Sequence, residues 1–224
     1  MKLSRRSFNA LAILNAMTLG SGAFAQNRES KALKSNGSEG LTIMQGATDA
    51  STSQLSIVVP KGLNLKYFAR EEVTNAVYEP TEMRVEQQKF SDWCVVKLYF
   101  TNMNLGDQYE LICQKSDGTV VDQRKFRLLD PTRDSIRLGV ISCMMDHFHR
   151  DFMWQALQKE APELLFFIGD SVYADMPNIL GSINADLKLY WQRFVEARNK
   201  LEFYRFRELI PVIAIWDDHD YGIN

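Results

Sequence analysis

The chain has 224 residues, a formal net charge of −2 and 46% hydrophobic residues. This length allows one or two domains with a sizeable core. The near-neutral charge gives no basic footprint for nucleic acid, and no stretch beyond the N-terminal region is apolar and long enough to span a bilayer. We therefore expect a globular protein with no nucleic-acid partner and no stable membrane span.

The N-terminus has the pattern of an export signal. Arg5 and Arg6 precede an apolar run over residues 10–19, and an Ala-x-Ala sequence ends at Ala25. This order is typical of a secretory signal peptide, and the paired arginines point to the twin-arginine route. The alternative is an ordinary secretory signal with two chance arginines. We expect residues 1–25 to be the signal peptide, the twin-arginine export machinery to be a partner, and the mature protein to be periplasmic or secreted.

Short β-rich runs alternate with turn signals over residues 41–130, after a polar, flexible lead-in at residues 26–40. Asp117 and Gly118 form a strong hairpin signal between two of these runs. The spacing and turn chemistry predict an N-terminal antiparallel β-sandwich. The expected strands cover residues 54–59, 65–68, 93–100, 109–113 and 120–128.

Three cysteines follow the signal peptide: Cys94, Cys113 and Cys143. They are too few for a disulfide framework. Cys94 and Cys113 lie on expected neighbouring strands and could pair after export. Free buried thiols are the alternative, because small buried cysteines are common.

The periodicity changes at residues 130–133, where we place the domain boundary. Beyond it, strands and helices alternate in the order β-α-β-α-β, which predicts a parallel sheet with helices on its faces. Residues 134–224 would then be the first part of an α/β domain. The expected strands cover residues 136–142, 164–168 and 212–216, and the expected helices cover residues 150–160, 185–195 and 202–209.

Carboxylates follow two of these apolar strands directly. Asp170 follows the second strand, and the run WDDHD at residues 216–220 follows the third. The carboxyl ends of parallel strands meet at one edge of a sheet, where ligands commonly bind. Three acids around His219 would repel one another unless a cation neutralised them, and His219 could donate a proton to a leaving oxygen. The alternatives are that Asp170 caps a helix and that the acidic run is a solvated turn.

Other donors lie close to these positions in sequence. A phenolate at Tyr173 is a good ligand for a ferric ion, and the amide oxygen of Asn224 suits calcium. Cys143 ends the first strand of this part, where a thiolate would favour a transition metal, although an inert buried thiol is the alternative. Asp146, His147 and His149 follow, either as ligands and the groups that support them or as a polar loop and helix start.

Two motifs, GDSVYAD at residues 169–175 and WDDHDYGIN at residues 216–224, resemble the signature of the PhoD-like alkaline phosphatase family. This family is a branch of the calcineurin-like metallophosphoesterases. Cys143 with the serine before it is similar to that branch's first motif, and QGAT at residues 45–48 resembles the opening of its N-terminal β-domain. The resemblance implies a β-sandwich followed by an α/β metallophosphoesterase domain that binds Fe3+ and Ca2+.

The resemblance also implies roles for individual residues. The implied metal ligands are Cys143, Asp170, Tyr173, Asp218 and Asn224. Cys143, Asp170 and Tyr173 would hold the iron, and Asp170 would bridge to calcium and so take part in catalysis. His219 would act on the scissile phosphate. For Asp217 and Asp220, the choice between binding metal and orienting His219 stays open.

The implied activity is metal-dependent hydrolysis of small phosphomonoesters or phosphodiesters. Because the family's catalytic domain supplies further ligands beyond its acidic cluster, we expect this chain to be an N-terminal fragment of a larger enzyme that by itself binds metal weakly and turns over poorly. The alternative is an exported β-sandwich binding module with a non-catalytic phosphatase remnant.

Overall fold

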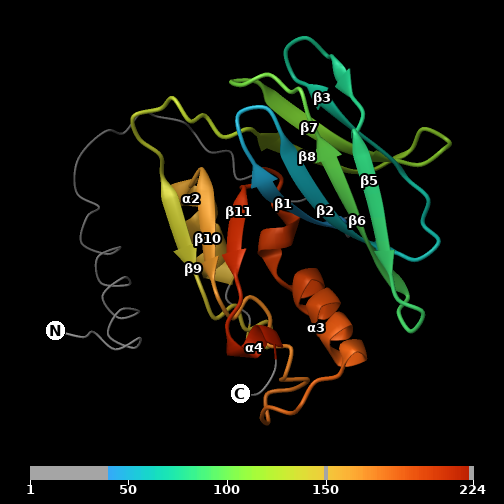
Figure 1. Ribbon diagram of the computed structural model, residues 1–224, viewed down its shortest axis with the longest axis vertical. Coiled ribbons are helices and arrows are strands. Elements are labelled where there is room, and N and C mark those ends of the chain that lie inside the picture. The colour runs from blue at the N-terminus through green and yellow to red at the C-terminus, as the bar shows by residue number, and fades with distance from the viewer. Residues whose placement is uncertain (1–39, 149–150, 222–224) are drawn as a thin grey trace. The chain divides into compact units, whose positions relative to one another are not determined.

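The computed structural model describes residues 40–148 and 151–221, which are rich in β-structure, with three sheets and few helices (Figure 1). The expected signal peptide and most of the expected lead-in lie outside the described residues, and so does Asn224. Among the helices of the described part, none has both the length and the apolar character needed to cross a bilayer.

The first eight strands form two four-stranded antiparallel sheets, with the orders β1-β2-β6-β5 and β4-β3-β7-β8. The strands of the first sheet are β1 (Thr42–Thr48), β2 (Ser53–Pro60), β5 (Glu82–Gln87) and β6 (Trp93–Phe100). Those of the second sheet are β3 (Lys66–Glu71), β4 (Val77–Tyr78), β7 (Gln108–Gln114) and β8 (Val120–Arg127). The hairpin expected at Gly118 joins β7 to β8. Gly118 itself has a φ of 90°, a conformation that favours glycine.

Inward-facing residues of both sheets form one hydrophobic cluster. Burial alternates along β6, as expected for a strand with one face on a core. Tyr109 and Phe126 stack in this cluster with ring centroids 5.6 Å apart. Cys94 and Cys113 are buried there as free thiols, and burial raises the pKa of both, so they stay protonated at neutral pH.

The third sheet is parallel and has the order β11-β10-β9. Its strands are β9 (Leu138–Ile141), β10 (Leu164–Ile168) and β11 (Val212–Ile215), and the helices are α2 (Asp151–Glu160), α3 (Leu187–Lys200), α4 (Asp218–Tyr221) and the 3-10 helix η1 (Glu202–Arg205). One face of β10 packs through Leu165 and Phe167 against Trp154 of α2 and Phe203 of η1. The other face leaves apolar residues of β9 and β11 exposed.

The expected helix at residues 202–209 is wrong beyond its first turn. Only Glu202–Arg205 is helical, as a 3-10 turn. The following residues run alongside β8, where the main chain of Lys125 donates to Arg207 and accepts from Leu209. Pro211 also disfavours a helix immediately before it. Pairing with a neighbouring strand therefore overrides the local helical pattern.

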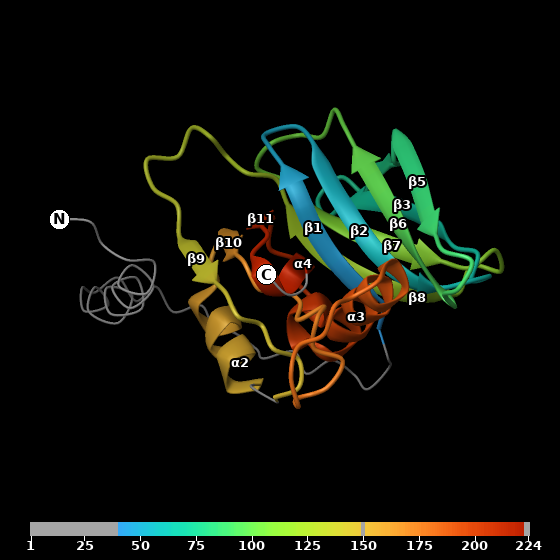
Figure 2. The same cartoon turned by 60° about the horizontal axis from the view of Figure 1, so that its bottom comes forward.

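A buried ion pair within β8 makes hydrogen bonds to two segments that are distant in sequence. Arg124 and Asp122 form a salt bridge with both side chains almost fully buried. The guanidinium also donates to the carbonyl oxygen of Phe206 at 2.8 Å, and the Asp122 carboxylate accepts from the backbone N–H of Leu41 at 2.5 Å. Figure 2 shows α3 beside β1 and β2. These bonds tie β8 to the residue before β1 and to the segment that follows η1.

Replacing Arg124 with Met should lower the free energy of unfolding by about 3–5 kcal/mol, because Asp122 would be left buried without its partner. The measurement is urea unfolding followed by circular dichroism. Arg84→Met is the matched control, since its pair with Glu82 is exposed, and it should leave the free energy of unfolding nearly unchanged. Equal losses in both variants would contradict this role for the Arg124 pair.

Candidate metal centre

Donor side chains collect at the carboxyl edge of the parallel sheet. β9 leads to Cys143, β10 to Asp170 and β11 to Asp218. The sulfur of Cys143 lies 3.5 Å from Oδ2 of Asp170. Ligand atoms of Asp170, Asp218 and His219 all lie within 4.8 Å of one another. The structure therefore brings together the three strand ends that the sequence pattern placed at one edge.

Two donors sit in unusual backbone conformations. Cys143 has φ 56° and Asp170 has φ 53°, in the left-handed region that non-glycine residues seldom adopt. Gly169, with φ 105°, precedes Asp170, and a Cβ there would lie 2.5 Å from Cβ of Asp217. The strand-end turn therefore requires glycine, as expected. Backbone strain of this kind is often concentrated at functional sites.

The carboxylate of Asp170 is only partly satisfied. Its Oδ2 accepts from the Cys143 thiol, whereas its Oδ1 is buried and has no hydrogen-bond partner among the described residues. Burial raises the pKa of Asp170, and the bond from Cys143 opposes this only in part. A buried oxygen without a donor is costly unless a proton or a cation compensates it. Asp170 is therefore suited to binding a cation.

Tyr173 lies against the imidazole of His219. The two ring centroids are 4.3 Å apart, with an interplanar angle of 31°. Burial raises the pKa of the Tyr173 phenol, and neighbouring Cys143 and Asp170 raise it further. The phenol thus stays protonated at neutral pH unless a cation displaces its proton.

His219 is oriented by Asp175, a role the sequence analysis did not assign. Nδ1 of His219 lies 2.9 Å and 3.0 Å from the two carboxylate oxygens of Asp175, which is buried. Burial alone would lower the pKa of His219, but the bond to Asp175 and the charges of nearby carboxylates outweigh it and raise the pKa. The sequence did contain a signal for this role, because Asp175 is the last residue of the GDSVYAD motif.

Asp220 holds two loops together and orients no imidazole. Its carboxylate accepts from the backbone N–H of Val172 at 2.9 Å and from that of Asp217 at 3.1 Å. Both of its oxygens are therefore engaged by main chain, and Asp220 is buried. This answers one of the alternatives left open for the acidic run: Asp220 is a structural residue.

Asp146 braces the loop after Cys143. Its carboxylate, fully buried, accepts from Arg193 of α3 at 2.5 Å and from Lys200 at 3.2 Å. Burial would raise the pKa of Asp146, but the pairing with Arg193 outweighs this and lowers it. Arg193 also donates to the carbonyl oxygen of Tyr173 at 3.2 Å. Asp146, a candidate ligand from its sequence position, is thus paired with the side chains of Arg193 and Lys200.

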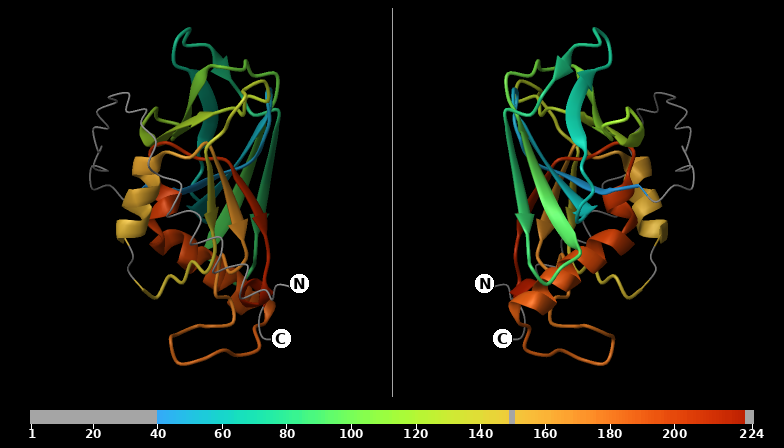
Figure 3. Two further views of the ribbon diagram at one scale, coloured as in Figure 1. Left: turned by 90° about the vertical axis from the view of Figure 1, so that its left-hand side faces the viewer. Right: turned by 90° about the vertical axis from the view of Figure 1, so that its right-hand side faces the viewer.

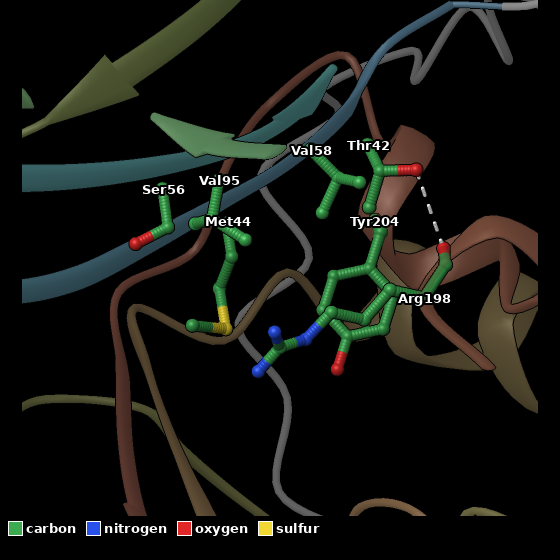
Figure 4. Close-up of a pocket in the computed structure, with 7 residues that line it drawn as sticks. All are labelled: Thr42, Met44, Ser56, Val58, Val95, Arg198 and Tyr204. Atoms are coloured by element: carbon green, nitrogen blue, oxygen red, sulfur yellow. Dashed lines mark hydrogen bonds between the residues drawn. The ribbon is translucent and has the colours of Figure 1, made fainter. Parts of the chain in front are cut away.

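A separate pocket lies away from these donors, between β1, β2, β6 and the region of α3 and η1 (Figure 4). Its lining residues are Thr42, Met44, Ser56, Val58, Val95, Arg198 and Tyr204. Apart from the Arg198 guanidinium the lining has no charged group, so it lacks the donor set of the strand-end cluster.

Comparisons with known proteins bear on the fold. No protein-family model matches the chain, and no curated protein matches its sequence. Among solved structures, the chain is similar to one described as "Structure of PhoD", with a TM-score of 0.60 and 14% sequence identity. The match covers 80% of this chain and 38% of that one, so this chain spans well under half the length of that neighbour.

A second solved structure, a pullulanase complexed with maltotriose from Anoxybacillus sp. LM18-11, is 15% identical over 35% of this chain and 11% of that one. Its TM-score of 0.24 is too low to indicate a shared fold. The likeness to the PhoD structure shows that the two share a fold.

Proposed function

We propose that the chain carries a site for metal-dependent hydrolysis of phosphate esters, of the alkaline phosphatase D type, acting on phosphomonoesters, phosphodiesters or both. One observation carries the proposal: thiol, carboxylate and imidazole donors converge at three parallel strand ends around a buried carboxylate oxygen with no partner. The similarity of the fold to that of the PhoD structure also supports this proposal. The finer arrangement, a β-sandwich followed by a metallophosphoesterase domain, is part of this proposal.

The donor set fits the two expected ions. Cys143, Asp170 and Tyr173 would hold Fe3+, because thiolate and phenolate are suitable ligands for a transition metal. Asp170, Asp218 and Asn224 would hold Ca2+, which prefers carboxylate and amide oxygens. When bound, such ions neutralise phosphate charge and make water a better nucleophile.

His219 would protonate the leaving oxygen of the ester. Asp175 occupies Nδ1, so Nε2 is the nitrogen left to face a substrate. The raised pKa of His219 increases the fraction that carries the proton near neutral pH. The ring of Tyr173 lies against the imidazole in a tilted arrangement. Asp175 thus acts as a positioning residue, and His219 acts on the substrate.

Asp170→Asn should abolish stabilisation by cations. In the unsubstituted protein, Fe3+ with Ca2+ at about 100 times the dissociation constant should add about 2.7 kcal/mol, a rise in Tm of roughly 5–10 °C. Differential scanning calorimetry measures the shift in Tm. Hydrolysis of a chromogenic phosphoester should be slower in Asp170→Asn than in the unsubstituted protein. Asp134→Asn, an exposed acid away from the site, is the control. A full rise in Tm on adding the ions to Asp170→Asn would contradict the proposal. No rise in Tm in the unsubstituted protein or in Asp170→Asn would favour the binding-module alternative.

Tyr173→Phe separates the ligand role of the phenol from the packing role of its ring. Phenylalanine keeps a ring against His219 but offers no oxygen to iron. We expect the iron-loaded protein to absorb visible light through phenolate-to-iron charge transfer, and we expect Tyr173→Phe to lose that band. Tyr221→Phe, at another tyrosine close in sequence to the site, should keep it. An unchanged spectrum in Tyr173→Phe would remove Tyr173 from the ligand set.

The pairing of His219 with Asp175 predicts a pH dependence. In the metal-free protein, the imidazole should titrate above its ordinary value of 6.5, and Asp175→Asn should lower the midpoint. Because the folded state holds the proton more tightly, the pair's contribution to stability is full below pH 6.5 and is lost as pH rises through the folded pKa. NMR titration of the ring measures the midpoint, with Asp186→Asn as control. Equal midpoints for the unsubstituted protein and Asp175→Asn would exclude this pairing.

A further inference from the structure

Arg193 of α3 is a buried arginine to which the proposed chemistry gives no role. Its side chain is only 1% exposed. A guanidinium so far from water is costly unless its charge is paired and its N–H groups have acceptors. The acceptors that Arg193 finds therefore indicate what it contributes to the site.

The guanidinium connects two of the loops that carry candidate ligands. Nη2 of Arg193 donates to Asp146 at 2.5 Å, and Asp146 lies in the loop that begins with Cys143. Nε donates to the carbonyl oxygen of Tyr173 at 3.2 Å. A third bond, from Nη1 to Glu196 at 2.7 Å, stays within α3. Arg193 thus joins the loop after β9 to the loop after β10.

The peptide unit between Tyr173 and Ala174 is held from two sides. Its carbonyl oxygen accepts from Arg193, and its N–H group donates to the carbonyl oxygen of His219 at 2.9 Å. The main chain that carries the Tyr173 side chain is therefore fixed between α3 and the acidic run.

Packing of α3 supports this arrangement. Val172 and Ala174 of the loop after β10 form a buried cluster with Ala197 of the helix. Both views of Figure 3 show the orange segment that follows β10 passing the ends of the parallel strands and turning back into α3. The helix that supplies Arg193 thus lies directly against the loop that carries Tyr173.

Lys200 separates two effects that Arg193 combines. Its amine donates to the other carboxylate oxygen of Asp146 at 3.2 Å, but its side chain is 52% exposed. An ammonium is a point charge, whereas the planar guanidinium can bond acceptors in two directions at once. Both residues compensate the charge of Asp146, and Arg193 in addition holds the Tyr173 carbonyl.

We propose that Arg193 is a positioning residue, which sets the spacing between Cys143 and Tyr173 so that both reach one ion. The inference rests on the proposed function, because it concerns ligands of the proposed iron. Arg193 acts through Asp146 and through the main chain of Tyr173, and it touches neither the ion nor the substrate.

The first measurement is the Fe3+ affinity of the full chain, by competition with nitrilotriacetate. Arg193→Met/Asp146→Leu removes both buried charges, so that neither is left unpaired and the fold is kept. This variant should bind Fe3+ about 10–100-fold more weakly, the usual effect of removing a group that orients a metal ligand. Arg193→Lys, which keeps a charge beside Asp146 but lacks the planar fork, should also bind more weakly. Lys200→Met is the matched control and should bind as the unsubstituted protein does.

The second measurement is hydrogen exchange of the metal-free protein. The Ala174 amide should exchange roughly tenfold or more faster in Arg193→Met/Asp146→Leu, because a hydrogen bond from a charged donor adds about that factor to local stability. The Leu165 amide, which donates to the carbonyl oxygen of Pro211 at 2.9 Å, should exchange at an unchanged rate.

Three results would overturn the inference. Unchanged Fe3+ affinity or unchanged Ala174 exchange in the Arg193 variants of a protein that binds iron would overturn it and leave the proposed function standing. An equal fall in affinity in Arg124→Met/Asp122→Leu would show a general loss of stability, since that buried pair bonds Phe206 and Leu41 instead of the donor loops. An unsubstituted protein that binds no Fe3+ would overturn the proposed function and this inference together.

Discussion

The hydrogen bonds to the Asp220 carboxylate hold the two acidic strand-end loops together. They bring the main chain after β10, at Val172, to the main chain after β11, at Asp217. A further bond from the N–H of Ala174 to the carbonyl oxygen of His219 adds to this link at 2.9 Å. These bonds hold the two loops side by side, and ligand atoms of Asp170 and His219 lie within 4.8 Å of each other there.

Each buried acid near this edge is satisfied in a different way. Asp220 accepts from backbone N–H groups, Asp175 holds an imidazole, and Asp146 is paired with Arg193 and Lys200. Asp170 is the exception, since its Oδ1 atom is buried and has no hydrogen-bond partner among the described residues. The surrounding chain thus satisfies the carboxylates of Asp146, Asp175 and Asp220 but leaves Oδ1 of Asp170 without a partner. This asymmetry is the physical reason to expect a cation there.

Some of this arrangement could be predicted from sequence because the signals were strong and local. β10 lies at the residues expected, since an uninterrupted apolar run bounded by a proline-containing turn and a glycine leaves little choice. The clustering of Cys143, Asp170 and His219 followed from parallel strands sharing one edge. β5 was missed because it holds only two apolar residues, Met83 and Val85, and it packs no face against the core, since every residue of the strand is exposed.

Other features depended on contacts between distant segments. Asp175 and His219 are 44 positions apart, and Asp146 and Arg193 are 47 apart, so no local pattern joins either pair. The wrong helix at residues 202–209 has the same origin, because pairing with Lys125 of β8 determines that backbone. Local periodicity therefore found the strands that deliver donors, whereas the groups that orient those donors became visible only in three dimensions.

The most direct test of the central claim is a crystal structure of the iron- and calcium-loaded protein with anomalous difference maps recorded at the iron edge. The account predicts an iron peak within coordination distance of Oδ1 of Asp170 and the sulfur of Cys143. A map with iron bound elsewhere, or with Oδ1 of Asp170 satisfied by a protein donor and no metal beside it, would contradict the account.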